Sequence, residues 1–537
     1  MSASREKKLR QDQTASGYVD PKAEKELEEK KAEKRSNVLY SVIAVLFVLV
    51  VAASFLWRSN VISRNATALT IDGEKYSAAE VNFYYQNVYR GFLQSNSYFI
   101  SYLGLDTNAS LKSQTVNATA ASMMGVEEGS SWHDYIMDNT VKQMTMIQRG
   151  LKQAQEEGYQ FPASVQEQYE DSLNSLKTSA ESTGMSVKAY LQKNLGAIMT
   201  EKVYNQQVLR MLQYQAYAQS YSDSLTYTDE QVEAKDAEDP AVYNSYSYNQ
   251  YYLSSSRYLD DDATNAEKAA AAEADAKSLV SDEINSVEAL DAAIAALEVN
   301  ADTTASSSAM DDTRYTSVSS VVAQWISDSS RQEGDKTYIA NTSTTTDDDG
   351  NEVETISGYY VVYYRSSSDN STPLVNVRHM LAGFEGGTTE NGTTTYSDEE
   401  KAAAKEKAES WLQAWEDGDA TEESFAALAN ENSTDTGSNT NGGLYENVYP
   451  GQMVSAFNNW CFDENRKAGD TGIVETSYGY HVMYFVGQSD ETYREYLIKN
   501  DLTSEDYTNW YNGLVDALDM TVGDTSYIRT NLVMKAN

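Results

Sequence analysis

A histidine in one of two nearly identical strand-like runs raises the first question of chemistry. The chain has only three histidines in 537 residues. One of them, His481, lies in the alternating run E-T-S-Y-G-Y-H-V-M-Y-F at Glu475–Phe485, whereas the near-copy at Glu354–Tyr364 has Tyr360 at that position. If the imidazole takes part in chemistry, only the later copy can carry it. The alternative is a hydrogen-bonded histidine that merely belongs to a core.

The similarity between the two runs continues along the chain. Five residues recur with the same spacing in both halves: Trp325, Asp328, Arg331, Gly334 and Asp335, and then Trp460, Asp463, Arg466, Gly469 and Asp470. Upstream, an Ala-rich helical pattern at Lys268–Val280 matches one at Lys401–Trp415. Each copy is predicted to contain a strand, two helices, a loop and closing strands, so the pattern indicates one α+β domain present twice.

The second copy contains five spaced motifs that carry a family resemblance. They are V-N-V-R-H-M-L at Val375–Leu381, N-S-T-D-T-G-S at Asn432–Ser438, N-G-G-L-Y at Asn441–Tyr445, G-Q-M-V-S-A-F at Gly451–Phe457 and Y-G-Y-H-V-M at Tyr478–Met483. Together, over roughly Thr372–Gly487, they resemble the parvulin (PpiC-type) family of peptidyl-prolyl cis/trans isomerases. The resemblance implies an isomerase that uses no cofactor and no metal.

The resemblance also implies roles for individual residues. The expected catalytic residues are His379, Asp435, Thr476 and His481. The expected substrate-binding residues around the proline ring are Tyr445, Met453, Phe457, Phe462 and Tyr478. The chain departs from the family where G-G-D-L-G is replaced by G-G-L-Y-E, which places Tyr445 at a pocket leucine. Trp460 and Tyr478 are also bulkier than their counterparts, so the shape of the pocket is expected to differ.

The chemistry of prolyl isomerisation agrees with these residue types. Rotation about a peptide bond faces a barrier of about 18 to 20 kcal/mol, while the two isomers of an X-Pro bond are nearly equal in energy. A dry apolar socket for the ring and polar groups that favour the twisted amide are therefore sufficient. Paired histidines with a nearby carboxylate can order such a polar floor, with no covalent step.

Two further expectations follow from residues that are absent. The first copy contains no histidine, and its first strand, Y-S-Y-N-Q-Y-Y-L, offers only Gln and Tyr, so we expect it to keep the fold and lose the chemistry. It is either a binder of extended chain through its tyrosines or a spacer. The loop Ala382–Glu400 of the second copy has several carboxylates and no cation, which predicts no preference for phosphorylated substrates.

Composition excludes several classes of function. A net charge of −40 and a pI near 4.3 argue against a nucleic-acid partner, which would need a basic face. A single cysteine, Cys461, cannot form an intramolecular disulfide or a thiolate metal cluster, and it is not an N-terminal cysteine for lipidation. The remaining histidine, His133, stands beside Trp132 at the start of a predicted helix with no second ligand at helical spacing. A structural or surface role is expected for it.

One segment predicts a membrane anchor. Val38–Trp57 contains no charged residue, and about 20 apolar residues suffice to cross a bilayer as a helix. Cations before it outnumber those just after it, which predicts a cytoplasmic N-terminus. Those before it include Lys7, Lys8, Arg10, Lys30, Lys31, Lys34 and Arg35, and those just after it are Arg58 and Arg64. The alternative is a cleaved signal peptide, but the apolar run is long for one.

The sequence therefore predicts an α+β multi-domain chain that resembles PrsA-type and SurA-type foldases. The expected parts are a cytoplasmic tail (1–36), a transmembrane anchor (37–57), a helical chaperone-like region (65–225), a degenerate parvulin-like domain (226–369), a parvulin domain (370–488) and a C-terminal helical segment (489–537). The expected partners are unfolded exported polypeptides with X-Pro bonds, the membrane, no nucleic acid, and conceivably a second copy of the chain. The alternative function is a non-catalytic chaperone that uses both parvulin-like domains as adaptors.

Overall fold

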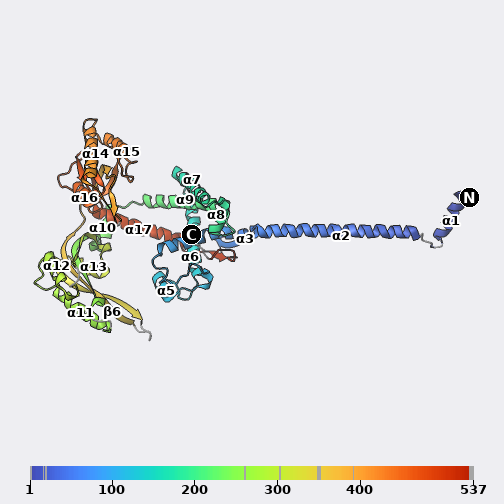
Figure 1. The fold of residues 1–537 in the computed structure, drawn as a ribbon, viewed down its shortest axis with the longest axis horizontal. Helices are drawn as coiled ribbons and strands as arrows, with labels where there is room; N and C mark the ends of the chain where they lie inside the picture. Colours follow the sequence, from blue (N-terminus) through green and yellow to red (C-terminus); the bar gives the residue numbers. More distant parts are fainter. Residues whose placement is uncertain are drawn as a thin grey trace. The chain divides into compact units, whose positions relative to one another are not determined.

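The computed structural model describes residues 3–15, 17, 21–258, 262–300, 304–346, 352–390 and 392–530. The chain divides into two compact units, each treated separately below. The first unit consists of residues 1–224 together with 507–537, and the second consists of residues 225–506 (Figure 1).

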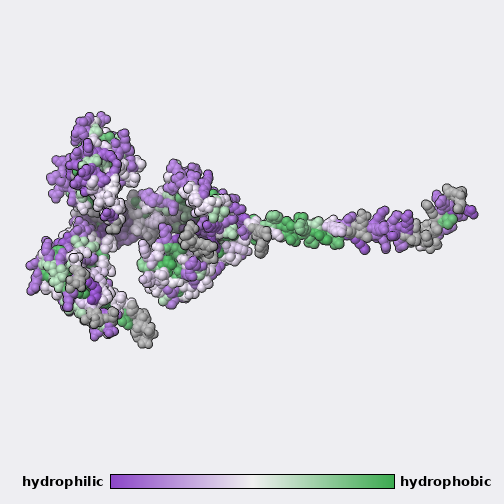
Figure 2. All heavy atoms as spheres, in the orientation of Figure 1, coloured by the Kyte–Doolittle hydropathy of each residue, from purple (hydrophilic) through white to green (hydrophobic). Residues whose placement is uncertain are grey.

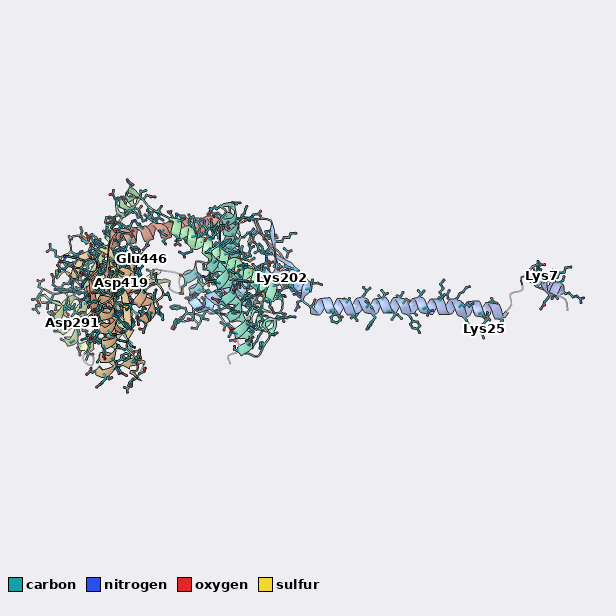
Figure 3. All side chains as sticks on the ribbon, turned by 90° about the horizontal axis from the view of Figure 1, so that it is seen from above. Lys7, Lys25, Lys202, Asp291, Asp419 and Glu446 are labelled. Carbon is teal, nitrogen blue, oxygen red and sulfur yellow. The ribbon has the colours of Figure 1, made fainter. Side chains whose placement is uncertain are left out.

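Two helices open the chain, α1 (Ala3–Ala15) and α2 (Pro21–Arg58). Within α2, Asn37–Phe55 has a mean hydropathy of 2.7 and none of it is buried against protein. Figure 2 shows this stretch as a hydrophobic band along the helix. Lys7 and Lys25 extend from the segments that precede it (Figure 3). Among the described residues, this is the one helix long and apolar enough to cross a membrane.

The first unit is mainly helical. Its helices are α3 (Val61–Asn65), α4 (Ala78–Ser95), α5 (Ala118–Met124), α6 (Trp132–Glu156), α7 (Ala163–Ser182), α8 (Val187–Leu195) and α9 (Glu201–Ser224). Ser77 and Glu80 form a capping box at the start of α4. The core packs α4, α6 and α9 around large aromatic residues such as Trp132 and Tyr85. His133 is buried there and its Nδ1 lies 2.9 Å from the Tyr85 hydroxyl, which fits the structural role expected for it.

The C-terminal part of the chain returns to this unit as a strand. The helix α17 (Tyr493–Val515) is followed by β13 (Met520–Val522), which pairs with β1 (Thr67–Ile71) in a sheet completed by β2 (Glu74–Ser77). The helical segment expected at 489–537 contains α17, but it also contains the end of β12, which runs to Thr492, and the strand β13, which was not expected. A strand this short gives no periodic signal in the sequence, and its conformation depends on pairing with β1. Residues 531–537 lie outside the described part.

The second unit contains two four-stranded antiparallel sheets, and its first helix is α10 (Asp229–Asp236). The first sheet has the order β4-β3-β6-β5 and the second has the order β10-β7-β12-β11. The strands of the first sheet are β3 (Ser245–Ser254), β4 (Ser308–Arg314), β5 (Lys336–Thr346) and β6 (Glu352–Ser368). The helices of this copy are α11 (Asn265–Ser278), α12 (Val287–Ala296) and α13 (Ser320–Ile326). In both sheets, the first strand of the copy lies between the short middle strand and the last strand.

The second sheet and its helices form the copy that carries the motifs. Its strands are β7 (Pro373–Gly383), β10 (Leu444–Val448), β11 (Thr471–Glu475) and β12 (Gly479–Thr492), and its helices are α14 (Asp398–Glu416), α15 (Glu422–Asn432) and α16 (Ser455–Cys461). A small hairpin, β8 (Thr388–Glu390) and β9 (Thr393–Thr395), follows β7. Acidic side chains such as Asp419 and Glu446 lie on the surface of this copy (Figure 3).

The repeated Trp and Arg residues make the same local contact in both copies. The guanidinium of Arg331 lies 4.2 Å from the ring centre of Trp325, and its Nε donates to the Trp325 carbonyl at 3.1 Å. Arg466 and Trp460 repeat this arrangement at 4.0 Å and 3.0 Å. The recurring spacing in the sequence thus corresponds to a cation–π contact that closes the turn before the final strands.

Candidate active site

Two neighbouring strands bring His379 and His481 together. β7 and β12 are antiparallel, and His379 pairs with Met483 while His481 pairs with Leu381. The two histidines are therefore diagonal neighbours on one face of the sheet, within reach of long and aromatic side chains. Their rings lie 5.1 Å apart at 27°, and their Nδ1 atoms are 3.0 Å apart. Both side chains are buried.

Each ring makes a second contact through its Nε2 atom. The Nε2 of His379 lies 2.9 Å from Oδ2 of Asp435 and 3.1 Å from the Ser438 hydroxyl. The Nε2 of His481 lies 2.9 Å from the hydroxyl of Thr476. A continuous hydrogen-bonded chain thus runs from Thr476 through both imidazoles to a carboxylate.

The charge of Asp435 sets the direction of this chain. A carboxylate only accepts, so the Nε2 of His379 carries the proton that it donates to Asp435. In a neutral imidazole the Nδ1 of His379 is then an acceptor, and the Nδ1 of His481 donates to it. The Nε2 of His481 in turn accepts from the hydroxyl of Thr476. Every buried nitrogen is satisfied in this arrangement with both rings neutral.

The electrostatics of the site agree with a neutral His481 and a charged Asp435. Hydrogen bonds from His379, Ser438 and the Gly437 backbone hold the pKa of Asp435 well below its usual range, against the effect of burial. Burial, followed by the proximity of His379, lowers the pKa of His481 to about 3. The hydroxyl of Tyr445 donates to Asp435 Oδ2 at 3.0 Å, and burial followed by this carboxylate raises the pKa of Tyr445.

Aromatic rings enclose the histidine pair. Tyr445 stacks on His379 with ring centres 5.3 Å apart, and Phe457 stands edge-on to both histidines at 5.4 Å. A cavity of about 310 Å³ opens beside them. It is lined by His379, Leu381, Asp435, Tyr445, Gln452, Met453, Val454, Phe457, Tyr478 and His481. The cavity thus combines an apolar wall with a floor made by the hydrogen-bonded chain.

A double-glycine turn places the loop that carries Asp435 against β7. The backbone N–H of His379 donates to the carbonyl of Gly443 at 2.9 Å. Gly443 has φ +69°, and a Cβ at this position would lie 2.1 Å from the carbonyl oxygen of His379. Only glycine fits here, because any side chain would push the loop off the strand. The N-G-G motif therefore fixes the distance between Asp435 and the imidazole.

Most of the residues predicted for the site meet at this cavity. The structure brings together His379, Asp435 and His481, lined by Tyr445, Met453, Phe457 and Tyr478, with Thr476 behind His481. Phe462, predicted as a pocket residue, is not among the residues that line this cavity; it follows the last residue of α16 and packs against the hydrophobic cluster that includes Phe457 and Cys461. Tyr478 lies at the rim and is 63 % exposed.

The sequence prediction missed two polar contributors. Ser438 is fully buried and its hydroxyl contacts both His379 and Asp435. It is the last residue of the motif N-S-T-D-T-G-S, three residues after the carboxylate, and this spacing was a usable signal. Gln452 lines the cavity next to Met453 and had no signal beyond its neighbour.

The first copy has no equivalent of this chain. Tyr360 pairs with Tyr252, and Gln250 pairs with Val362, at the positions that the two histidines hold in the second sheet. The rings of Tyr252 and Tyr360 lie 4.8 Å apart, and the Tyr252 hydroxyl contacts that of Ser357 at 3.0 Å. The first copy therefore presents tyrosines where the second presents an imidazole network.

Comparisons with known proteins agree with this site. Residues 359–488 match the family described as the PPIC-type PPIase domain, a match that begins before the boundary predicted at 370. The foldase protein PrsA 1 of Listeria innocua is 35% identical over 111 residues, which cover 19% of this chain and 38% of that protein. The same protein from a strain of Listeria monocytogenes is 34% identical over 111 residues, with the same coverage. The chain thus spans well under half the length of these relatives.

Solved structures overlap with a similar part of the chain. The crystal structure of PrsA from Bacillus subtilis has a TM-score of 0.19 at 20% identity, covering 29% of this chain and 54% of its own. A structure of SurA-like chaperones from Campylobacter jejuni has a TM-score of 0.16 at 22% identity, covering 26% and 51%. Overlap at this level does not define the architecture of the whole chain. The match at 359–488, with the histidine network inside it, shows that this part of the chain is similar to the PPIC-type PPIase domain.

Proposed function

We propose that this protein is a membrane-anchored foldase whose PPIC-type domain catalyses cis/trans isomerisation of X-Pro bonds in exported polypeptides. The observation that carries the proposal is the series of hydrogen bonds from Thr476 through His481 and His379 to Asp435, beside an apolar-walled cavity of about 310 Å³. A cavity of this size suits a prolyl ring and the residue before it, which are the parts of the substrate that must turn.

The apolar wall binds the ring and excludes water. Met453 and Phe457 offer a thioether and an aromatic face to the pyrrolidine, and burial of that ring holds the X-Pro bond over the polar floor. Catalysis then requires stronger binding of the twisted amide than of the planar one, since the barrier of about 18 to 20 kcal/mol arises from amide resonance.

The polar floor supplies fixed charge and oriented dipoles. Asp435 remains ionised because three donors hold it, and the imidazoles keep their protons in one direction along the chain. A preorganised site of this kind stabilises the altered charge distribution of the twisted amide without reorganising itself. No bond forms or breaks in this mechanism, and both histidines act by position and polarity.

The membrane-spanning segment at 37–57 would hold the catalytic domain outside the cell, with the N-terminus in the cytoplasm. The apolar band of α2 and the excess of cations before it support this topology. The single native cysteine makes it testable, because Cys461 is only 1% exposed. Cysteine placed at the exposed position Asp419 should react with a membrane-impermeant maleimide in intact cells, whereas cysteine at Lys7 should react only after lysis. The reverse pattern would contradict the topology.

The first copy is proposed to be a second parvulin-like domain that lost its catalytic residues and kept a binding role. The corresponding strand orders of the two sheets and the repeated Trp–Arg contacts support a common origin. The helical region at 65–225 would hold unfolded clients. The competing proposal, a chaperone in which both copies are only adaptors, predicts binding of clients without turnover of X-Pro bonds.

One experiment separates the two proposals. Purified full-length protein in detergent should accelerate cis/trans exchange in a short Ala-Pro peptide, measured by exchange spectroscopy. Replacing His379 by Ala should abolish most of the acceleration, because the chain to Asp435 is broken. Tyr360→Phe in the first copy is the matched control and should leave the rate unchanged. Binding of unfolded protein with no acceleration by the wild type would establish the adaptor instead.

A further inference from the structure

We infer that the first copy contributes a second substrate site, in which the client residues flanking the prolyl bond are bound between the two copies. This inference rests on the proposed isomerase function and assigns the first copy a part in it. A cavity of about 450 Å³ lies where the copies meet within the second unit. Its lining comes from both: Asp311, Asp312, Arg314, Tyr449, Pro450, Gly451, Met453, Ser455, Asn458, Asn459 and Tyr493.

The new cavity and the isomerase cavity share one lining side chain. Met453 lines both, and it stands in the proposed wall for the prolyl ring. A client chain whose proline rests on one side of Met453 can place its neighbouring residues on the other side. The polar cavity on the other side of Met453 is therefore in position to receive the residues next to that proline.

Hydrogen bonds of Arg494 connect segments that flank the two copies, and they support the walls of this cavity. The guanidinium of Arg494 donates to both carboxylate oxygens of Asp236, at 2.6 and 3.2 Å, and to the side chain of Asn244 at 2.8 Å. It also donates to the carbonyls of Pro240 and Asp369. A hydrophobic cluster that includes Tyr243, Leu374 and Tyr493 fills the space around it. Segments from before and after both sheets are thus joined at one arginine.

A bulge in β4 directs side chains toward this cavity. The register between β3 and β4 shifts opposite Ser247, where the ladder passes from Tyr246–Thr313 to Tyr248–Met310. Asp312 has φ +42°, and its backbone N–H donates to the Ser247 hydroxyl at 3.0 Å. Bulges re-aim side chains at the edges of sheets, and β4 is an edge strand. Its outer backbone groups have no partner strand in the part of the chain that the structure describes, which suits an extended ligand.

The charges of the cavity indicate which client segment fits. Asp311 is paired with Arg365, while Asp312 and Arg314 form no ion pair with any residue that the structure describes. The wall therefore presents one negative and one positive charge near each other, with no net preference for charged clients. Tyr449 and Tyr493 stack at 4.5 Å and 2°, forming a flat aromatic side. The expected ligand is an extended, uncharged polar segment that flanks a proline.

The test compares short and long substrates on the full-length protein. The short substrate is a tetrapeptide with a central Ala-Pro bond, and the long one extends it with Ser, Thr, Asn and Tyr by about five residues on each side, roughly 17 Å of extended chain. The ratio of kcat/KM for the long peptide to that for the short one is measured for the wild type, Asp312→Ala, Arg314→Ala and Asn459→Ala. Lys268→Ala, on α11 and outside the cavity lining, removes one charge as the control.

We expect the ratio to exceed one in the wild type and in Lys268→Ala, and to fall about fivefold in each cavity variant, as a lost hydrogen bond predicts. Circular dichroism checks that the variants are folded. An equal ratio in all proteins would overturn the inference while leaving the isomerase proposal intact. If no peptide is turned over, the isomerase proposal fails, and the affinity for a fluorescent long peptide decides the inference: the same loss in the three cavity variants supports it, and equal affinity in all refutes it.

Discussion

Acidification should destabilise the PPIase domain, because it must charge a histidine that the fold keeps neutral. The pKa of His481 is lowered to about 3 by burial and by His379, whereas an unfolded histidine has a pKa of about 6.5. The unfolded state therefore binds more protons than the folded state between these values. Under that condition stability rises with pH, so the domain should be most stable above pH 6.5 and lose stability as the pH falls toward 3.

The size of the effect follows from the two pKa values. At pH 5 the ratio of protonated to neutral His481 is about 30 in the unfolded state, whereas His481 is essentially neutral in the folded state. The free energy of unfolding should thus be about 2 kcal/mol lower at pH 5 than at pH 7.5. Asp435 contributes little to the change between pH 7.5 and pH 5: its pKa is lowered, so the stability that it provides is present above the pKa of an unfolded carboxyl and is lost as the pH falls from that value toward the lowered one.

The single cysteine reports on this domain within the intact protein. Cys461 ends α16, is 1% exposed and packs against Phe457 and Val375. Burial raises the pKa of its thiol to about 12, so it should react only when the domain opens. The rate of labelling by a pyridyl disulfide, divided by the rate for the unfolded protein at the same pH, gives the free energy of opening. We expect that ratio to rise about 30-fold from pH 7.5 to pH 5.

The control is His481→Gln, which cannot titrate and should show a much smaller change over the same range. Equal pH dependence in the variant and the wild type would refute the neutral assignment for His481. Labelling that slows as the pH falls would be stronger evidence against it, since a stability gain in acid requires a histidine that holds a proton more tightly in the fold.

Three further outcomes are expected for the full-length protein. Because the histidines act by position, His481→Gln should lower kcat/KM by about tenfold and His481→Ala by more; complete loss in a folded Gln variant would indicate obligatory proton transfer. Peptides with phosphoserine before proline should be turned over no faster than unmodified ones, since the β7–α14 loop contains carboxylates and no cation, and Lys407 of α14 is already paired with Glu385 of that loop; a clear preference for the phosphopeptide at physiological salt would contradict this. Tyr445→Phe keeps the stacked ring but removes a donor to Asp435, so kcat/KM should fall by less than about tenfold; a loss of a hundredfold would mean that the hydroxyl contacts the substrate.

Most residues of the site could be predicted from the sequence, whereas the hydrogen bonds between them could not. His379 and His481 stand in motifs whose order and spacing are specific, so their meeting on adjacent strands was predictable. The direction of the hydrogen-bonded chain depends on three donors that converge on Asp435 from different segments. Sequence separation hides the contact of Tyr445 with Asp435, which is why Tyr445 was predicted only as a pocket residue, whereas Ser438 lies three residues from Asp435 and was missed although its spacing was a usable signal.

Errors in the prediction arose where tertiary contacts decide the outcome. Phe462 has the chemistry of a pocket residue, but its place at the end of α16 turns it to the core. The strand β13 has no pattern of its own and depends on a partner more than 400 residues away in the chain. Local features are different: the capping box of Ser77 and Glu80 can be recognised from the sequence, because all of its contacts lie within four residues.

The return of the chain to its first unit has a consequence for biogenesis. β1 lacks its partner on one edge until Met520–Val522 is available, and Asn82 and Gln86 of α4 bond the backbone of Arg529. During N-to-C synthesis, residues 225–506 emerge before these contacts can form. The second unit, with its isomerase domain, can therefore finish folding while the first unit still waits for its closing strand. The protein is proposed to assist the folding of other chains. Its own folding would be completed last in the first unit, where β1 pairs with β13.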